Sequence, residues 1–120
     1  MSGGTDRGLG AARRLRRRDE FQAVYNRGLR THGKLMTVFL LPQQGGATRL
    51  GIAATKKLGG AVQRNRAKRL IREVFRQHAN PDGLHIVVVP RPALVTASYE
   101  AIRDDYASCL ARRHRRDRAR

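Results

Sequence analysis

The sequence has one cysteine, few acidic residues and no long apolar run. A single thiol excludes a disulfide within the chain and a cysteine-based metal site. Cys109 stands among the apolar residues of a predicted late helix, which favours a buried core thiol. No apolar run reaches the roughly 20 residues of a membrane-spanning helix, and residues 1–14 lack the apolar centre of a signal peptide. We therefore expect a cytoplasmic protein.

Acidic residues number 9 against 26 Lys and Arg, so the formal net charge is +17 and the sequence pI about 11.8. A charge of this size attracts polyanions, which makes nucleic acid the first partner to consider. The basic residues are spread over the whole chain, unlike those of a basic amphipathic membrane helix. We expect no membrane contact and no requirement for a protein partner.

The 120 residues, 40% of them hydrophobic, have room for one domain with a modest core. Residues 1–14 are small and polar and are expected to form a flexible basic tail. The folded domain is expected over residues 15–111. Residues 112–120 are almost wholly basic and are expected to fray into solvent.

The apolar pattern predicts three helices and three strands. Asp19 is the expected cap of a first helix that ends at Gly28, and Ser98 the expected cap of a last one. The central helix is predicted over residues 61–78. Strands are predicted over residues 35–41, 49–54 and 84–89, the first two paired as an antiparallel hairpin and the third buried on both faces. The order helix, two strands, helix, strand, helix is typical of a small α+β sandwich.

Two opposite faces are apparent in the central helix at 100° per residue. The apolar face consists of Ala67, Leu70, Ile71, Val74 and Phe75, and the polar face of Asn65, Lys68, Arg69, Arg72 and Arg76. A solvated face usually mixes acids with bases, yet Glu73 is the only acid between Lys56 and Arg76. Like charges on one helix destabilise it unless a polyanion neutralises them, so this face is predicted to bind phosphate.

The segment from Lys56 to Glu73, KKLGGAVQRNRAKRLIRE, closely resembles the signature of the bacterial ribonuclease P protein family. Its centre is the triplet Arg64-Asn65-Arg66. The segment Arg18 to Gly28 resembles the family's first helix, and residues 49–52 resemble the strand before the signature. The resemblance covers roughly residues 15–110.

This resemblance implies a sandwich related to the second domain of ribosomal protein S5, with a left-handed βαβ crossover. It also implies the function of the family, which is to help a catalytic RNA, with Mg²⁺ bound mainly by that RNA, remove the 5′ leader of precursor tRNA. The residues that would contact the catalytic RNA are Lys56, Lys57, Arg64, Asn65, Arg66, Lys68, Arg69 and Arg72. The residues that would line the leader cleft are Phe21, Tyr25 and Phe39. From spacing alone Phe21 and Tyr25 would be core residues, and Phe21 stays open between cleft and core.

No catalytic group of the protein itself is predicted. Its four histidines are scattered, Ser98 and Cys109 have no evident base, and Asp104-Asp105 is interpreted as a solvated helix face. The endoribonuclease activity is therefore assigned to the complex, with no catalytic residue and no metal ligand in this chain. Two alternatives remain, a ribosomal protein of similar size and charge, and a DNA-binding architectural protein, although no helix-turn-helix spacing is present.

Overall fold

The computed structural model describes the backbone of residues 13–119 and the side chains of residues 13–112. Its helices and strands are, in chain order, α1 (Arg18–Arg27), β1 (Leu29–His32), β2 (Met36–Pro42), β3 (Arg49–Ile52), η3 (Lys56–Leu58), α2 (Ala61–Gln77), β4 (Leu84–Pro90), η4 (Pro92–Thr96) and α3 (Tyr99–Ala119), where η marks a 3₁₀ turn. The predicted α+β sandwich is confirmed. No helix in this described part of the chain is long and apolar enough to cross a membrane.

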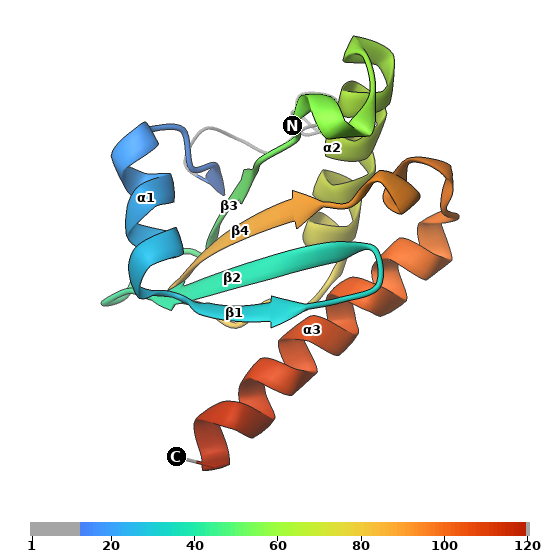
Figure 1. The fold of residues 1–120 in the computed structure, drawn as a ribbon. Coiled ribbons are helices and arrows are strands. Elements are labelled where there is room, and N and C mark those ends of the chain that lie inside the picture. The colour runs from blue at the N-terminus through green and yellow to red at the C-terminus, as the bar shows by residue number, and fades with distance from the viewer. Residues whose placement is uncertain (1–12, 120) are drawn as a thin grey trace, which may run out of the picture.

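The four strands form one sheet in the order β1-β2-β4-β3 (Figure 1). The predicted hairpin of β2 with β3 is wrong, because both strands pair with β4, β2 antiparallel and β3 parallel. β4 has a continuous apolar sequence that tolerates burial on both faces and hydrogen bonding along both edges. β4 therefore lies between β2 and β3 in the sheet, a position that a β2–β3 hairpin would have occupied by pairing those two strands directly.

The sequence did not predict β1, which pairs antiparallel with β2 at the edge of the sheet. Only Thr31 of its four residues is buried, so no apolar alternation marks it as a strand. β1 forms because the backbone N–H and C=O groups along the free edge of β2 need hydrogen-bond partners, which is a requirement of the tertiary structure.

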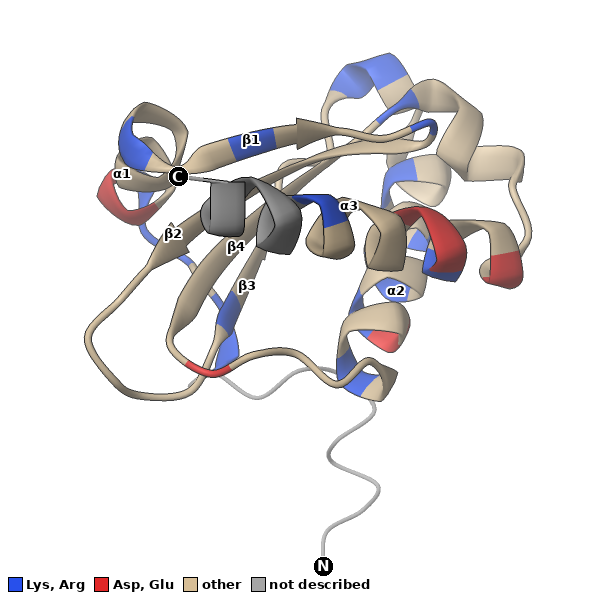
Figure 2. Ribbon diagram, turned by 90° about the horizontal axis from the view of Figure 1, so that it is seen from below, with Lys and Arg blue, Asp and Glu red and all other residues tan. Residues whose placement is uncertain are grey.

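The connection from β3 through α2 to the parallel strand β4 crosses behind the sheet in Figure 1, while β4 lies beside β3 toward the lower right. This arrangement makes the crossover left-handed, as the resemblance implies and against the usual right-handed rule. Figure 2 shows α1 and α2 on opposite sides of the sheet.

Each face of the sheet has its own apolar core. The larger core joins Val38, Ile86 and Val88 to the apolar faces of α2 and α3. Cys109 is fully buried there, as predicted. The smaller core lies under α1 and is built around Leu15, Val24, Leu41 and Val87. Because α1 is one short helix, it covers only part of its face.

Three local predictions need correction. Asp19 lies inside the first turn of α1 rather than at its cap, and Glu20 reaches back to the N–H groups of Arg16 and Arg17. Asp105 is buried, and its carboxylate accepts the N–H groups of Lys34 and Leu35 at 2.9 and 2.8 Å. The basic segment after Arg112 continues α3 as a helix to Ala119. The predicted cap at Ser98 is confirmed by a bond from the N–H of Ala101.

The boundaries of the folded domain also differ slightly from expectation. Arg13 and Arg14 fall in the predicted N-terminal tail, yet both contact the domain. The guanidinium of Arg13 lies 5.2 Å from the ring centre of Phe75, and Arg14 forms a parallel bridge with Leu50. Residues 1–12 of that tail lie outside the described residues.

Candidate nucleic-acid interface

Three aromatic side chains meet where α1 leaves the sheet uncovered. The ring centres of Phe21 and Tyr25 are 6.4 Å apart, and those of Tyr25 and Phe39 are 5.0 Å apart at an edge-to-face angle of 75°. All three residues are half-buried. Burial raises the pKa of the Tyr25 phenol, so this hydroxyl stays neutral at physiological pH. The structure thus brings together the residues that the sequence predicts as a cleft.

Phe21 packs against the sheet and also borders a cavity. Its ring lies directly on Gly51 of β3, where an added Cβ would be 2.6 Å from the ring. Gly51 is in register with Val87, and Val87 with Phe39. Phe21 therefore packs against the sheet, and the same residue borders the basic cavity beside the cluster.

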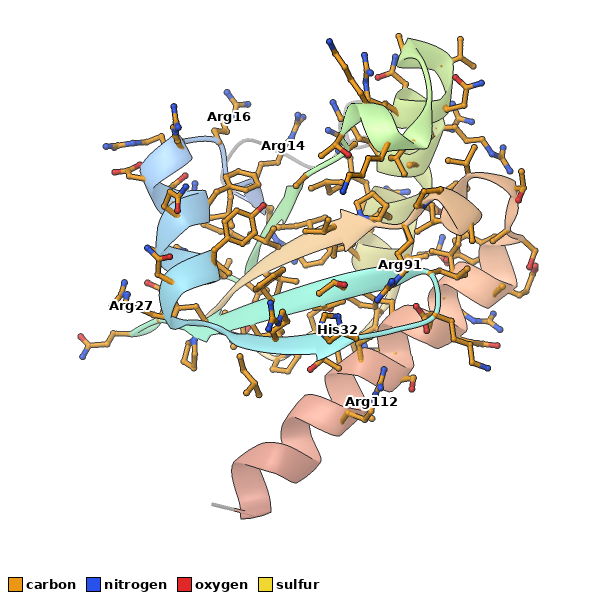
Figure 3. The ribbon with its side chains drawn as sticks, viewed as in Figure 1. Arg14, Arg16, Arg27, His32, Arg91 and Arg112 are labelled. Carbon is orange, nitrogen blue, oxygen red and sulfur yellow. The ribbon has the colours of Figure 1, made fainter. Side chains whose placement is uncertain are left out.

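A cavity of about 150 Å³ lies between the segment before α1, β3 and α2. Four basic residues line it, namely Arg14, Arg16, Lys68 and Arg72. Figure 3 labels Arg14 and Arg16, which lie in the space between α1 and α2. Burial, and then the positive charge of Arg14, lower the pKa of Arg72. None of the described residues that line this cavity is acidic, so these surroundings favour an anion.

The outer face of α2 carries a second group of the predicted residues. Asn65, Arg66 and Arg69 are exposed, and Arg64 is half-buried. Arg64 Nη1 donates to the Gly59 carbonyl at 3.2 Å and Arg66 Nε to the Val95 carbonyl at 2.9 Å. Each bond uses one of five guanidinium N–H donors and restricts the side chain.

Lys56 and Lys57 form a third group on η3, one short loop before α2. Both are exposed, and the hydroxyl of Thr55 caps the turn by accepting the N–H of Lys57. The residues predicted to contact one RNA surface therefore occupy three places. Lys68 and Arg72 line the cavity that Phe21 borders. The Arg64-Asn65-Arg66 triplet and Arg69 lie on the outer face of α2, and the two lysines precede its first residue.

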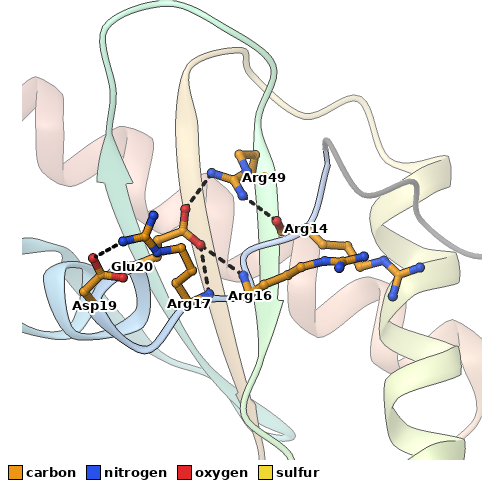
Figure 4. A network of polar contacts seen from close by, with 6 residues as sticks. All are labelled: Arg14, Arg16, Arg17, Asp19, Glu20 and Arg49. Carbon is orange, nitrogen blue, oxygen red and sulfur yellow. Dashed lines mark hydrogen bonds and ion pairs between the residues drawn. The ribbon is translucent and has the colours of Figure 1, made fainter.

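A polar network holds the segment before α1 in place (Figure 4). The Glu20 carboxylate accepts the N–H groups of Arg16 and Arg17, both at 3.0 Å, and pairs with Arg49 at 2.8 Å. Arg49 also donates to the carbonyl of Arg14 at 2.7 Å. Burial alone would raise the pKa of Glu20, but the two backbone N–H groups and Arg49 outweigh it and lower the pKa to about 2. The network thereby positions the arginines at the cavity.

Arg14 and Arg16 line the cavity but are not among the site residues predicted from the sequence. The available signal was the run Arg13-Arg14-Leu15-Arg16-Arg17-Arg18, whose single apolar residue anchors it to the core. Leu15 is buried in the core, and Arg14 and Arg16 on either side of it line the cavity. Arg17, in the same run, is exposed to solvent. The position of the cavity itself depends on β3 and α2, which are distant in sequence.

The groups on this surface are of the kinds that bind nucleic acid. Its polar groups are guanidinium, ammonium and amide donors, which suit phosphate oxygens, and its aromatic rings offer faces for bases. Within the described residues, no group of three or more His, Cys, Asp or Glu could hold a metal ion. The fold and this surface together define a small basic α+β sandwich with an exposed basic helix and a cluster of three aromatic rings.

Comparisons with known proteins agree with this class. The family model described as Ribonuclease P matches residues 9–114. The ribonuclease P protein component of Brevibacillus brevis is 40% identical over 102 residues, which cover 82% of this chain and 81% of that protein. The component of Desulfotalea psychrophila is 44% identical over 91 residues, which cover 74% and 76%. The chain belongs to the ribonuclease P protein family.

Solved structures show the same fold. The ribonuclease P protein of Staphylococcus aureus superposes with a TM-score of 0.75 at 30% identity, covering 83% of this chain and 94% of that chain. The protein of Thermotoga maritima gives a TM-score of 0.75 at 31% identity, covering 82% and 96%. The family match decides against both alternatives considered from the sequence, a ribosomal protein and a DNA-binding protein.

Proposed function

We propose that this chain is the protein subunit of a ribonuclease P holoenzyme that removes the 5′ leader of precursor tRNA. In this proposal α2 contacts the catalytic RNA, and the cleft between α1 and the sheet binds the leader. The observation that carries it is the position of the aromatic cluster beside a cavity whose described lining has four basic residues and no acidic one. Rings beside cations suit a single strand, whose bases stack while its phosphates are neutralised.

The contact with the catalytic RNA is assigned to the outer face of α2 and to η3. Arg64, Asn65, Arg66 and Arg69 are the central residues, with Lys56 and Lys57 at one end. The bonds from Arg64 and Arg66 to main-chain carbonyls hold their guanidinium groups at the surface of the fold. Such pre-organised cations lose little side-chain entropy when they bind phosphate.

The contact with the leader is assigned to Phe21, Tyr25 and Phe39, with Lys68 and Arg72 at the border with α2. Tyr25 and Phe39 are assigned as the stacking surfaces, because the tip of the Phe21 ring is packed on Gly51. Lys68 and Arg72 belong to α2 yet line the cavity beside Phe21. They would bind the phosphates nearest the catalytic RNA.

In this proposal Mg²⁺ and the cleavage chemistry belong to the catalytic RNA. Mg²⁺ prefers carboxylate and phosphate oxygens, and the proposed interface presents cations instead. This chain would supply phosphate neutralisation and substrate binding and would favour a well-ordered RNA at low Mg²⁺. A purified chain that cleaved precursor tRNA without the RNA would overturn this division.

The test measures leader removal by the catalytic RNA of the same genome at low Mg²⁺, with and without the protein. Wild-type protein is expected to stimulate cleavage. Arg64→Gln/Arg66→Gln is expected to lose the stimulation and bind the catalytic RNA about 10-fold or more weakly, because two charge-assisted phosphate bonds disappear. A matched control is Arg103→Gln, an exposed arginine of α3 that pairs with Asp104.

A second experiment tests leader binding in the cleft independently of catalytic-RNA binding by α2. Tyr25→Leu is expected to weaken binding of precursor tRNA to the holoenzyme about 5- to 150-fold, since stacking contributes about 1–3 kcal/mol per base. Binding of mature tRNA, which has no leader, should not change. Equal weakening for both tRNAs would contradict the cleft assignment, and no stimulation by folded wild-type protein would contradict the function itself.

A further inference from the structure

A second basic groove lies at the opposite edge of the sheet from the cavity beside α2. It is a cavity of about 560 Å³ along the outer edge of β1. It is lined by Gly28, Leu29, Arg30, Thr31, His32 and Arg112, and we refer to these residues as the β1 groove. Figure 3 labels His32 on β1 and Arg112 on α3.

The groove contains donors that lack acceptors. The Thr31 hydroxyl and Arg112 Nε are buried without a hydrogen-bond partner among the described residues, and Thr31 is only 3% exposed. Leaving such groups unpaired is unfavourable, so an acceptor that enters the groove would be stabilised. Arg112 also contacts Cys109 through Nη2 at 3.4 Å, which directs part of its guanidinium toward the core.

The backbone of β1 adds further donors along the edge. Gly33 donates its N–H to Met36 across the hairpin. In an antiparallel ladder successive residues alternate in direction, so both the N–H and the C=O of His32 point away from β2, and the N–H is a donor at the edge. Among the residues whose side chains the structure describes, none that lines the groove is acidic. Its donors and charge therefore suit an anion with several oxygen acceptors, such as a phosphodiester.

One residue of the groove, Arg30, is a neighbour of the aromatic cluster. Arg30 is directly opposite Phe39 in the ladder of β1 with β2. Directly opposite residues share a face of the sheet, and neighbouring strands are about 4.8 Å apart. Arg30 is therefore the basic residue next to Phe39 on the side away from α2. Beyond it, the edge of β1 leads to Thr31 and Arg112 on the α3 side.

We propose that the β1 groove binds the phosphodiester backbone of the leader beyond the bases stacked on Tyr25 and Phe39. This inference rests on the proposed function, since the strand in the cleft is the leader. The catalytic RNA lies at α2 in that proposal, so the strand leaves the cleft at the opposite edge. Its nucleotides most distant from the cleavage site then cross β1, with Arg30 and Arg112 on either side.

Leader length provides the test. The holoenzyme is assembled from the full-length protein and the catalytic RNA, and its affinity is measured for precursor tRNAs with leaders of about 5 and about 10 nucleotides, the range that one single-strand module spans. Wild-type protein should bind the longer leader more tightly. Thr31→Val and Arg112→Gln should each reduce that gain about 3- to 10-fold, the range of one lost hydrogen bond, and leave the shorter leader unaffected.

Two controls identify the source of any effect. Arg103→Gln removes the same charge from α3 outside the groove and should keep the full gain. Thr31→Val replaces an unpartnered buried hydroxyl with a methyl group, so the free protein should be no less stable. Arg112→Gln should also lower the salt dependence for the longer leader by about 0.7 in the slope of log K against log salt, the value for one phosphate of a single strand.

Two results would overturn the inference. The first is an unchanged gain in both groove variants while Tyr25→Leu still weakens precursor binding, which would leave the proposed function intact. The second is equal weakening for both leader lengths or for the catalytic RNA alone, which would place a different RNA segment in the groove. If wild-type protein neither bound the catalytic RNA nor stimulated cleavage, the proposed function would fail instead.

Discussion

At the scale of single residues, two adjacent aspartates show how tertiary structure separates identical side chains. Asp104 is exposed and pairs with Arg103, whereas Asp105 is buried and accepts two N–H groups from the turn between β1 and β2. From the sequence, both aspartates are predicted to lie on a solvent-exposed helix face. Successive helix residues are 100° apart, so one of two neighbours can face the sheet while the other faces solvent.

Asp105→Asn is expected to destabilise the protein by about 2 kcal/mol, because the amide can accept one N–H but places its own NH₂ group against the other. Asp104→Asn is the matched control and should change stability by less than about 0.5 kcal/mol. Urea denaturation at neutral pH measures both. Equal effects would show that the bonds from Lys34 and Leu35 do not stabilise the turn.

Gly51 is a second residue whose importance depends on its surroundings. An added Cβ would lie 2.6 Å from the Phe21 ring and 3.1 Å from Leu15. Gly51→Ala is expected to cost about 1–3 kcal/mol and to displace Phe21 from the sheet, since overpacking forces neighbours to move. Gly60→Ala is the control, because the nearest atom there is in ordinary contact at 3.4 Å. Thermal unfolding distinguishes them, and comparable losses would contradict the packing argument.

At the scale of elements, α2 is the part of the fold that local sequence specifies best. Ala67, Ile71, Val74 and Phe75 are buried, as their spacing predicts. The sequence predicts less well which of the polar side chains of α2 line the cavity and which face solvent. Lys68 and Arg72 line the inner cavity while Arg69 is exposed, because β3 and the segment before α1 border only one side of the helix. The sequence of a helix does not show which strand will pack beside it.

The joint between the N-terminal segment, α1 and β3 depends on the ionised Glu20. Folding lowers its pKa from the ordinary 4.5 to about 2. The carboxylate therefore stabilises the fold above pH 4.5, and this stability is lost as the pH falls from 4.5 toward 2. Glu20→Gln should lower stability by about 1–2 kcal/mol at neutral pH, a range reduced for solvent screening.

The measurement compares urea unfolding of wild type and Glu20→Gln at about pH 6 and about pH 3, on either side of the ordinary carboxyl pKa. The difference between the two proteins should shrink at the lower pH, since the other carboxyl groups titrate in both. Asp19→Asn, which removes an exposed carboxylate from the same turn, is the control. A constant difference would show that the ionised form of Glu20 is not what joins these elements.

At the scale of the whole molecule, the net charge of +17 affects folding and binding in opposite directions. Like charges repel within the compact fold, and salt screens that repulsion. Raising NaCl from about 0.02 to about 0.5 M should therefore raise the melting temperature of the free protein while it weakens RNA binding. Thermal unfolding and filter binding test the two trends. A melting temperature that fell with salt would contradict the self-repulsion argument.

The sequence alone determined the charge, the three helices, three of the four strands and the family, because these depend on local spacing and on one contiguous signature segment. The tertiary structure alone decided that β4 separates β2 from β3, that β1 completes the sheet, and that Arg14 and Arg16 meet Lys68 and Arg72. It also decided that Asp105 is buried. The physical reason is that strand pairing and the convergence of distant side chains satisfy hydrogen bonds and burial across the whole chain, and these requirements leave no periodic trace in any one segment.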